Sequence, residues 1–293
     1  MRTRTVAGLV VVHLFKMTSL IVLITGCIFL PYLPGPYDAL AVTLSAMAST
    51  ASIAGLLLVP IGALWLIFEF RKPAPAGEGS SPQHKWCAFA SLAVALLIGA
   101  LVSVIALASM GPSLACGTMA LWVYAVSRTL ARLKRPRQFE LPRFNPTPLY
   151  LILVPTTVVL LQWALAGPAT EFSRNRAIAN SAQFIHHIEQ YHRAYGHYPR
   201  SLLAEWKDYR PMVIGISEFH YEPNGESYNV FFEQPTFRFG TREFVMYNTR
   251  NEHVLASHNS DRLLWTVEQQ AARPGYYAVH DASIPDWKYF WFD

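Results

Sequence analysis

Five long apolar runs constrain the fold of this chain more than any other feature of its sequence. The hydrocarbon core of a membrane is about 30 Å thick, and a helix needs about 20 apolar residues to cross it. Runs of this length lie at about 9–32, 43–69, 86–110, 113–131 and 148–167. Only 15% of the residues are charged and the mean hydropathy is +0.22, which is too apolar for an ordinary soluble protein. Residues 1–168 are therefore predicted to form an α-helical membrane bundle of five transmembrane helices.

The residues between the runs predict how these helices are connected. The second run lies within the longer apolar stretch 39–70, which predicts a tilted helix or one that extends beyond the lipid. Only residues 111–112 separate the third run from the fourth, so these two are predicted to form a tight helical hairpin. The fifth run ends at Gly167 and Pro168, and the proline is expected to break the helix there.

Basic residues alternate along the membrane half of the chain. Residues 1–170 carry twelve Lys and Arg against four Asp and Glu, a net +8, whereas 171–293 carry twelve against fifteen, a net −3. The basic residues precede the first run and follow the second and fourth, while the connections after the first and third have none. Cytoplasmic loops are enriched in Lys and Arg, so the N-terminus is predicted to be cytoplasmic and residues 169–293 to lie on the far side. This pattern does not indicate binding to nucleic acid.

The start of the chain admits a second interpretation. A basic start followed by an apolar run is also the pattern of a secretory signal peptide. The first run is long for such a peptide, is interrupted by Lys16, and has no small-x-small cleavage site before "FLPYLPGPY". A retained transmembrane span is therefore the favoured interpretation.

An amphipathic helix is predicted after the fifth run, over "ATEFSRNRAIANSAQFIHHIEQYHRAYG". Glu189 and Arg193 are spaced for an exposed ion pair on it. Gly196 and Pro199 are expected to end it, since glycine adopts the left-handed C-cap conformation and proline cannot continue a helix. At 100° per residue one face gathers mostly apolar side chains, namely Ile178, Ser181, Ala182, Ile185, Ile188, His192 and Tyr195, with Phe184 and Tyr191 at its edge.

Downstream the apolar period changes to two, as in β-strands. "EFHYEPNGESYNVFFEQ" predicts a hairpin that turns at 223–225, and "REFVMYNTRNEHVLASH" predicts a second that turns around 249–251. "GYYAVH" and "WKYFWFD" predict further strands, and short helices are predicted at 202–209 and 260–273. Residues 169–293 are therefore predicted to be an α+β domain, with a long helix packed on an antiparallel sheet of four to six strands.

The end of the long helix and the first hairpin resemble a known family. "IEQYHRAYGHYPRSL" followed by "FHYEPNGESYNVFF" is similar to the globular region of type IV pilins and type II secretion pseudopilins. The matching positions are Ile188, Tyr191, Gly196, Tyr198, Pro199 and Leu202, and the resemblance covers residues 177–233. It implies a pilin-like domain and a bacterial envelope protein whose far side is the periplasm. The cleaved leader and single N-terminal helix of pilins have no counterpart here, so polymerisation is not implied.

Few residues carry the pattern of a chemical site. His192 stands three residues after Glu189, the Glu-x-x-His spacing of some metal sites, but two ligands make half a site and a packed histidine is the alternative. Glu222 and Glu226 are a pair of carboxylates near a hairpin tip, where acid–base chemistry or simple exposure are both open. No residue is therefore assigned as catalytic, cofactor-binding or metal-ligating, and no cofactor is expected.

Two classes of function remain open. One is a membrane-anchored, non-enzymatic module that binds a protein or glycan partner in the envelope, including a toxin against which it would be an immunity protein. The other is an envelope enzyme whose site forms from His192, His220 and His280. The lipid bilayer is a partner in both. Aromatic residues of the exported half, which fit a buried strand or a binding platform, support the first: Trp265, Tyr276, Tyr277, Trp287, Tyr289, Phe290, Trp291 and Phe292.

Overall fold

The chain forms two compact units. The helical unit comprises Met1–Phe29 and Thr43–Leu165, and the sheet unit comprises Leu30–Val42 and Ala166–Asp293. The computed structural model describes residues 6–71, 82–134, 145–200, 209–224, 226–238, 240–251, 253, 255–256, 264–265 and 277–292. The interspan segment 30–42 thus belongs with the C-terminal residues, although about 120 residues separate them in the sequence.

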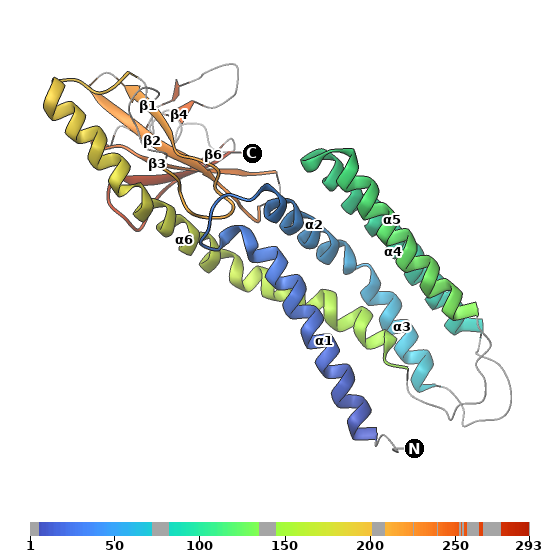
Figure 1. Cartoon of the computed structure of the whole chain (residues 1–293). Coiled ribbons are helices and arrows are strands. Elements are labelled where there is room, and N and C mark those ends of the chain that lie inside the picture. The colour runs from blue at the N-terminus through green and yellow to red at the C-terminus, as the bar shows by residue number, and fades with distance from the viewer. Residues whose placement is uncertain are drawn as a thin grey trace. The chain divides into compact units, whose positions relative to one another are not determined.

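The helical unit consists of apolar helices long enough to cross a membrane (Figure 1). Within the described residues four helices pass this test singly, and a bent pair, α2 and α3, makes a fifth if it counts as one span. This arrangement indicates a membrane protein and agrees with the five predicted runs. The elements are α1 (Val6–Phe29), α2 (Ala39–Gly55), α3 (Leu58–Phe70), α4 (Pro82–Met110), α5 (Pro112–Lys134) and the first part of α6 (Thr147–Tyr195).

The second run is not one helix, as the sequence had predicted, but two. The axes of α2 and α3 differ by 45°, and a turn at Leu56 and Leu57 separates them. Pro60 lies in the first turn of α3 and has no N–H to donate to the carbonyl of Leu56. That carbonyl instead accepts from the N–H of Val59 at 3.1 Å, a tighter turn that bends the pair.

The helices α4 and α5 form the predicted hairpin (Figure 1). Gly111 joins them with φ of +84°, a left-handed conformation that favours glycine. The indole of Trp122 lies against Gly99 and donates its N–H to the carbonyl of Ala95. A Cβ at Gly99 would overlap that indole, so the missing side chain is what allows the close packing.

The helix α6 runs without a break from Thr147 to Tyr195, 49 residues in all. The expectation that Pro168 breaks it is wrong. A proline removes one helix hydrogen bond and crowds the carbonyl four residues earlier, but the turns that follow are buried, with Ser173 and Ala177 fully inaccessible. Burial of this face outweighs the local cost. The predicted end is confirmed, because Gly196 has φ of +74° and its N–H bonds the carbonyl of His192 at 2.8 Å.

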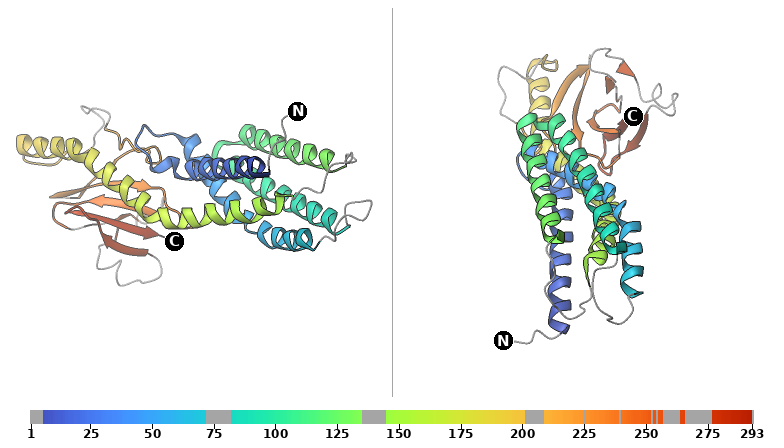
Figure 2. Two further views of the ribbon diagram at one scale, coloured as in Figure 1. Left: turned by 90° about the horizontal axis from the view of Figure 1, so that it is seen from below. Right: turned by 90° about the vertical axis from the view of Figure 1, so that its right-hand side faces the viewer.

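The sheet unit is an α+β domain, as predicted. The second half of α6 covers one face of a five-stranded antiparallel sheet in the order β1-β2-β3-β7-β6 (Figures 1 and 2). Phe184 and Ile188 of α6 pack there against Tyr228, Val230 and Phe232. The strands are β1 (His220–Asn224), β2 (Ser227–Gln234), β3 (Arg242–Tyr247), β6 (Tyr277–Asp281) and β7 (Trp287–Phe292), with β4 (Leu255–Ala256) and β5 (Leu264–Trp265) in a separate pair.

The buried face of α6 is rotated slightly from the predicted one. Ala177, Phe184 and Ile188 are buried, whereas Ala182 is exposed. Tyr195, predicted on the apolar face, is 62% exposed. The sheet therefore meets the helix along the row that passes through Phe184, and it does not reach the last turn.

Several strand predictions need correction. The first hairpin turns after Asn224, which pairs with Ser227, and not at 223–225; Pro223 is tolerated within β1 because this strand is an edge. The strand β3 forms no hairpin with β4, and its second neighbour is β7. Val245 and Met246 are buried on opposite faces, as a central strand requires.

One predicted short helix is a strand where it is described, and the other lies almost wholly outside the described residues. Residues 264–265 form the strand β5 instead of part of a helix at 260–273. The other residues of 260–273 lie outside the described residues. The helix predicted at 202–209 also falls outside them, apart from its last residue.

Candidate functional site

The three histidines of the enzyme hypothesis do not come together. His220 is on β1 and stacks on Phe231 with ring centres 5.0 Å apart, while His280 is on β6. These strands are the two edges of the sheet, about 19 Å apart at the usual strand spacing. The ring of His192 stacks on that of Tyr198, with ring centres 4.2 Å apart and 18° between the ring planes. This contact is the alternative of a packed histidine. In the described part of the chain no cluster of three or more His, Cys, Asp or Glu side chains is arranged to hold a metal ion.

Two of the three glutamates singled out in the sequence have structural partners, and the third, Glu222, pairs through its backbone with Asn229 within the β1–β2 hairpin. Glu189 accepts a hydrogen bond from the hydroxyl of Tyr228 at 2.8 Å. The predicted Glu189–Arg193 ion pair is replaced by a bond from Arg193 Nε to the main-chain oxygen of Glu189. Burial, together with the bond to Glu189, raises the pKa of the Tyr228 phenol, so it remains a neutral donor. Glu226 forms an exposed ion pair with Arg250 at 3.1 Å. This contact agrees with the alternative of simple exposure.

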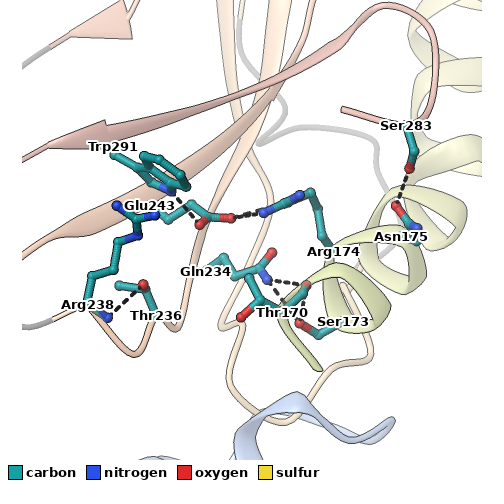
Figure 3. Close-up of polar contacts among 10 residues, drawn as sticks. All are labelled: Thr170, Ser173, Arg174, Asn175, Gln234, Thr236, Arg238, Glu243, Ser283 and Trp291. Carbon is teal, nitrogen blue, oxygen red and sulfur yellow. Dashed lines mark hydrogen bonds and ion pairs between the residues drawn. The ribbon is translucent and has the colours of Figure 1, made fainter. Parts of the chain in front are cut away.

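A buried ion pair joins α6 to the sheet (Figure 3). Arg174 of α6 donates from Nη2 and Nε to Oε1 of Glu243 on β3, at 2.6 and 3.2 Å. Trp291 of β7 donates its indole N–H to Oε2 of the same carboxylate at 2.8 Å. The two charged side chains are only 10% and 3% exposed. Both carboxylate oxygens are therefore hydrogen-bonded, which a buried charge requires.

Neutral polar groups continue this connection toward the start of the domain (Figure 3). The buried amide of Gln234 on β2 donates to the carbonyl of Thr170 at 2.6 Å and to the hydroxyl of Ser173 at 3.0 Å. Ser283, in the β6–β7 connection, donates to Asn175 at 3.1 Å. Polar contacts from three places in the sheet thus fix the rotation of α6 about its own axis.

Two arginines place their guanidinium groups over aromatic rings of β7. The guanidinium carbon of Arg174 is 3.7 Å from the ring centre of Tyr289, and that of Arg238 is 3.6 Å from the ring centre of Trp291. The ring of His280 stacks on Tyr289 at 4.9 Å and lies 4.1 Å from Trp291. We call Arg238, His280, Tyr289 and Trp291 the arginine–tryptophan surface. Cation–π contact holds both guanidinium groups in place.

The charges of this region do not cancel. Arg174 is neutralised by Glu243. Arg238 is exposed, and no carboxylate pairs with it among the described residues. Burial, and then the positive charge of Arg238, lowers the pKa of His280, so its imidazole is neutral at pH 7. Within the described residues, the arginine–tryptophan surface therefore carries one positive charge, that of Arg238, to which no carboxylate is paired.

The sequence pointed to the aromatic strand but not to its charged neighbours. Of the predicted aromatic faces of β7, Trp287 is buried, while Tyr289 and Trp291 are half-buried beside Arg174 and Arg238. The strand is thus partly core and partly surface. The one signal for Arg174 was its place four residues before Ile178, on the face of α6 predicted to be apolar.

A shallow groove of about 580 Å³ follows α6 beside the β6–β7 connection. Its walls are mainly apolar and include Ile178, Ile185, Ile284 and Trp287. Three polar side chains, His186, Glu189 and Arg193, line it farther along the helix. The groove offers shape for recognition but no cluster of reactive groups.

Comparison with known proteins adds no family. No protein-family model, no curated protein and no solved structure matches the chain. The resemblance of residues 177–233 to pilins therefore stays a prediction. A proposal for its function must therefore be based on the geometry of its own residues.

Proposed function

We propose that this chain is a multi-pass protein of the bacterial inner membrane that binds an envelope partner through its sheet unit, without catalysis. Its N-terminus is cytoplasmic and the sheet unit is periplasmic. The partner is a protein or a glycan that presents an acidic group. The alternation of Lys and Arg between the apolar segments supports this orientation.

The segment between α1 and α2 gives independent support for the topology. Gly35 in this segment donates its N–H to the carbonyl of Met212 at 3.1 Å, so the two residues lie on the same side of the membrane. Four apolar segments separate them along the chain: the α2–α3 pair, α4, α5 and the first part of α6. An even number of crossings returns the chain to the same side. If the bent pair did not cross, three crossings would place Gly35 and Met212 on opposite sides.

The contact of Arg238 with Trp291 is the main support for the binding proposal. Tryptophan and arginine are the residues most enriched at the energetic centres of protein interfaces. Arg238 keeps its charge exposed, and stacking on Trp291 at 3.6 Å reduces the conformational freedom that it would lose on binding. A carboxylate or phosphate of a partner would complete the charge balance. The separation of His220 from His280 supports binding over catalysis.

A photo-crosslinking experiment tests this proposal. The photoreactive residue p-benzoylphenylalanine replaces Thr236, a partly exposed residue two positions before Arg238 in the β2–β3 connection, and the full chain is irradiated in cells. We expect one adduct of defined mass, or a broad band that glycosidase treatment sharpens if the partner is a glycan. Arg238→Glu should abolish the adduct, because it reverses the charge that the partner meets.

Arg176→Glu is the matched control, since Arg176 is an exposed arginine of α6 in the same unit. It should leave the adduct intact. An adduct that persists in Arg238→Glu, or the absence of any adduct in cells that contain the folded protein, would contradict the proposal.

A further inference from the structure

We infer that Leu33, Tyr37 and Met212 form a lipid-facing surface, through which the sheet unit rests on the membrane interface. The inference rests on the proposed multi-pass topology and adds a second partner, the phospholipid headgroup region. We call these three residues the interface patch. They come from two parts of the chain that one unit brings together.

A ladder of main-chain bonds ties the two parts of the interface patch. Besides the Gly35–Met212 bond, the N–H of Ile214 donates to Leu33 at 3.0 Å and that of Gly215 to Pro31 at 2.7 Å. The N–H of Asp38 donates back to Ile214 at 3.0 Å. Residues 212–215 therefore follow the interspan segment from Pro31 to Asp38.

Close packing leaves this ladder little freedom. A Cβ on Gly215 would lie 2.7 Å from both the oxygen and the Cβ of Pro31, so the backbones approach as only glycine allows. Val213 and Ile216 are inaccessible to solvent. The segment 212–216 is anchored in the core of the sheet unit by two side chains and bonded to the interspan segment by its backbone.

The three side chains of the interface patch remain on the surface of the sheet unit. Leu33, Tyr37 and Met212 are 45%, 46% and 44% exposed. Met212 has φ of +52°, a left-handed conformation that costs energy for a residue with a side chain. This conformation leaves Met212 outside while its neighbour Val213 is buried. A large apolar side chain that a strained backbone holds on the surface would be stabilised by contact with an apolar environment.

The chain connections identify that environment as lipid. The interspan segment follows α1, which ends at Phe29, and precedes α2, which begins at Ala39. Tyr37 is two residues from α2, so it lies at most about 7 Å from the start of that helix even if the chain is fully extended. The headgroup layer adds about 5–8 Å on each side of the hydrocarbon core. Tyrosine is enriched in this layer, and Tyr37 stands two residues before α2.

Spin labelling in phospholipid nanodiscs tests the inference. A full-length variant with Cys27→Ser, Cys87→Ala and Cys116→Ser receives one new cysteine by Met212→Cys, Leu33→Cys or Tyr195→Cys, and each carries a nitroxide. The label is exposed to oxygen, which concentrates in lipid, and to a nickel chelate, which stays in water. We expect the ratio of oxygen to nickel accessibility at positions 212 and 33 to exceed that at 195 at least threefold. A ratio at 212 equal to that at 195 would overturn the inference.

Labelling of the unmodified chain guards against misfolding of the cysteine variants. A photoactivatable phospholipid with its diazirine near the headgroup should modify the peptide that contains Met212, and mass spectrometry should find no label on Tyr195. Label on neither residue would count against the lipid contact. The topology is read separately by a membrane-impermeant maleimide at position 195, which is exposed to water in the same unit, in sealed cells. Lipid contact without periplasmic access would overturn the orientation and keep the contact.

Discussion

At the scale of single residues, the Arg174–Glu243 ion pair is the strongest determinant of how α6 meets the sheet. Replacing Arg174 by Met would leave Glu243 buried and uncompensated, with only the bond from Trp291. Breaking a buried ion pair in this way costs about 3–5 kcal/mol of unfolding free energy. Denaturation of the purified protein in detergent, followed by tryptophan fluorescence, measures the loss.

Two controls separate the buried charge from general damage. Arg242→Ala removes one partner of an exposed pair with Glu233, and such pairs contribute about 0–1 kcal/mol. The double variant Arg174→Met, Glu243→Gln should recover part of the loss, because no charge stays buried. An Arg174→Met protein as stable as Arg242→Ala would show that the ion pair is not formed.

Tyr247 provides a prediction about pH. Burial, followed by the charges of Glu189 and Asp286, raises its pKa from 10.0 to about 12. A phenol with a raised folded pKa stabilises the fold below pH 10, and this contribution is lost as the pH rises from 10 to 12. Unfolding curves between pH 9 and 12 should therefore show falling stability.

The change Tyr247→Phe should reduce that slope, because the titrating phenol is gone. Tyr195→Phe, at an exposed position, should leave the slope unchanged. Equal slopes for the native chain and Tyr247→Phe would refute the assignment. The comparison uses differences between variants, so the titration of tyrosines that do not interact with Tyr247 cancels.

At the scale of elements, local signals predicted single helices and strands better than their breaks and partners. Gly196 ended α6 as predicted, since a C-cap glycine is a local signal. Pro168 did not break it, because burial of Ser173 and Ala177 depends on a sheet that lies far along the chain. The same limit explains β3, whose neighbour β7 begins 40 residues after β3 ends.

The α4–α5 hairpin yields a test at this scale. Gly99→Val should destabilise the helical unit, since its Cβ would overlap the indole of Trp122. Gly117→Val in α5 is the control, because nothing lies within 4 Å of a Cβ there. Thermal melting of the detergent-solubilised protein should show a lower midpoint for Gly99→Val alone. Equal midpoints for both variants would mean that the helices do not pack at Gly99.

The candidate site was less predictable than the elements. The aromatic residues of β7 were visible in the sequence as an alternating strand. The charges beside them come from α6, β3 and the β2–β3 connection, and no spacing rule relates these places. The enzyme hypothesis required the dispersed residues His192, His220 and His280 to converge, and the strand order that separates His220 from His280 became visible only in the fold.

At the scale of the whole molecule, the side of the membrane that each segment occupies determines what the sheet unit can reach. The interface patch and the arginine–tryptophan surface are both parts of the sheet unit. The arginine–tryptophan surface needs that unit to lie outside the cytoplasm if an envelope partner is to reach it, whereas the interface patch can meet lipid on either side. The bond between Gly35 and Met212 makes the prediction strict, because the interspan segment and the sheet unit must share a side.

Reporter fusions measure this directly. Alkaline phosphatase, which is active only in the periplasm, is fused after Asp293, within residues 33–37, and within residues 74–79 between the second and third apolar runs. We expect activity for the first two fusions and none for the third. An inactive fusion after Asp293 together with an active one at 74–79, both at normal protein levels, would contradict this expectation.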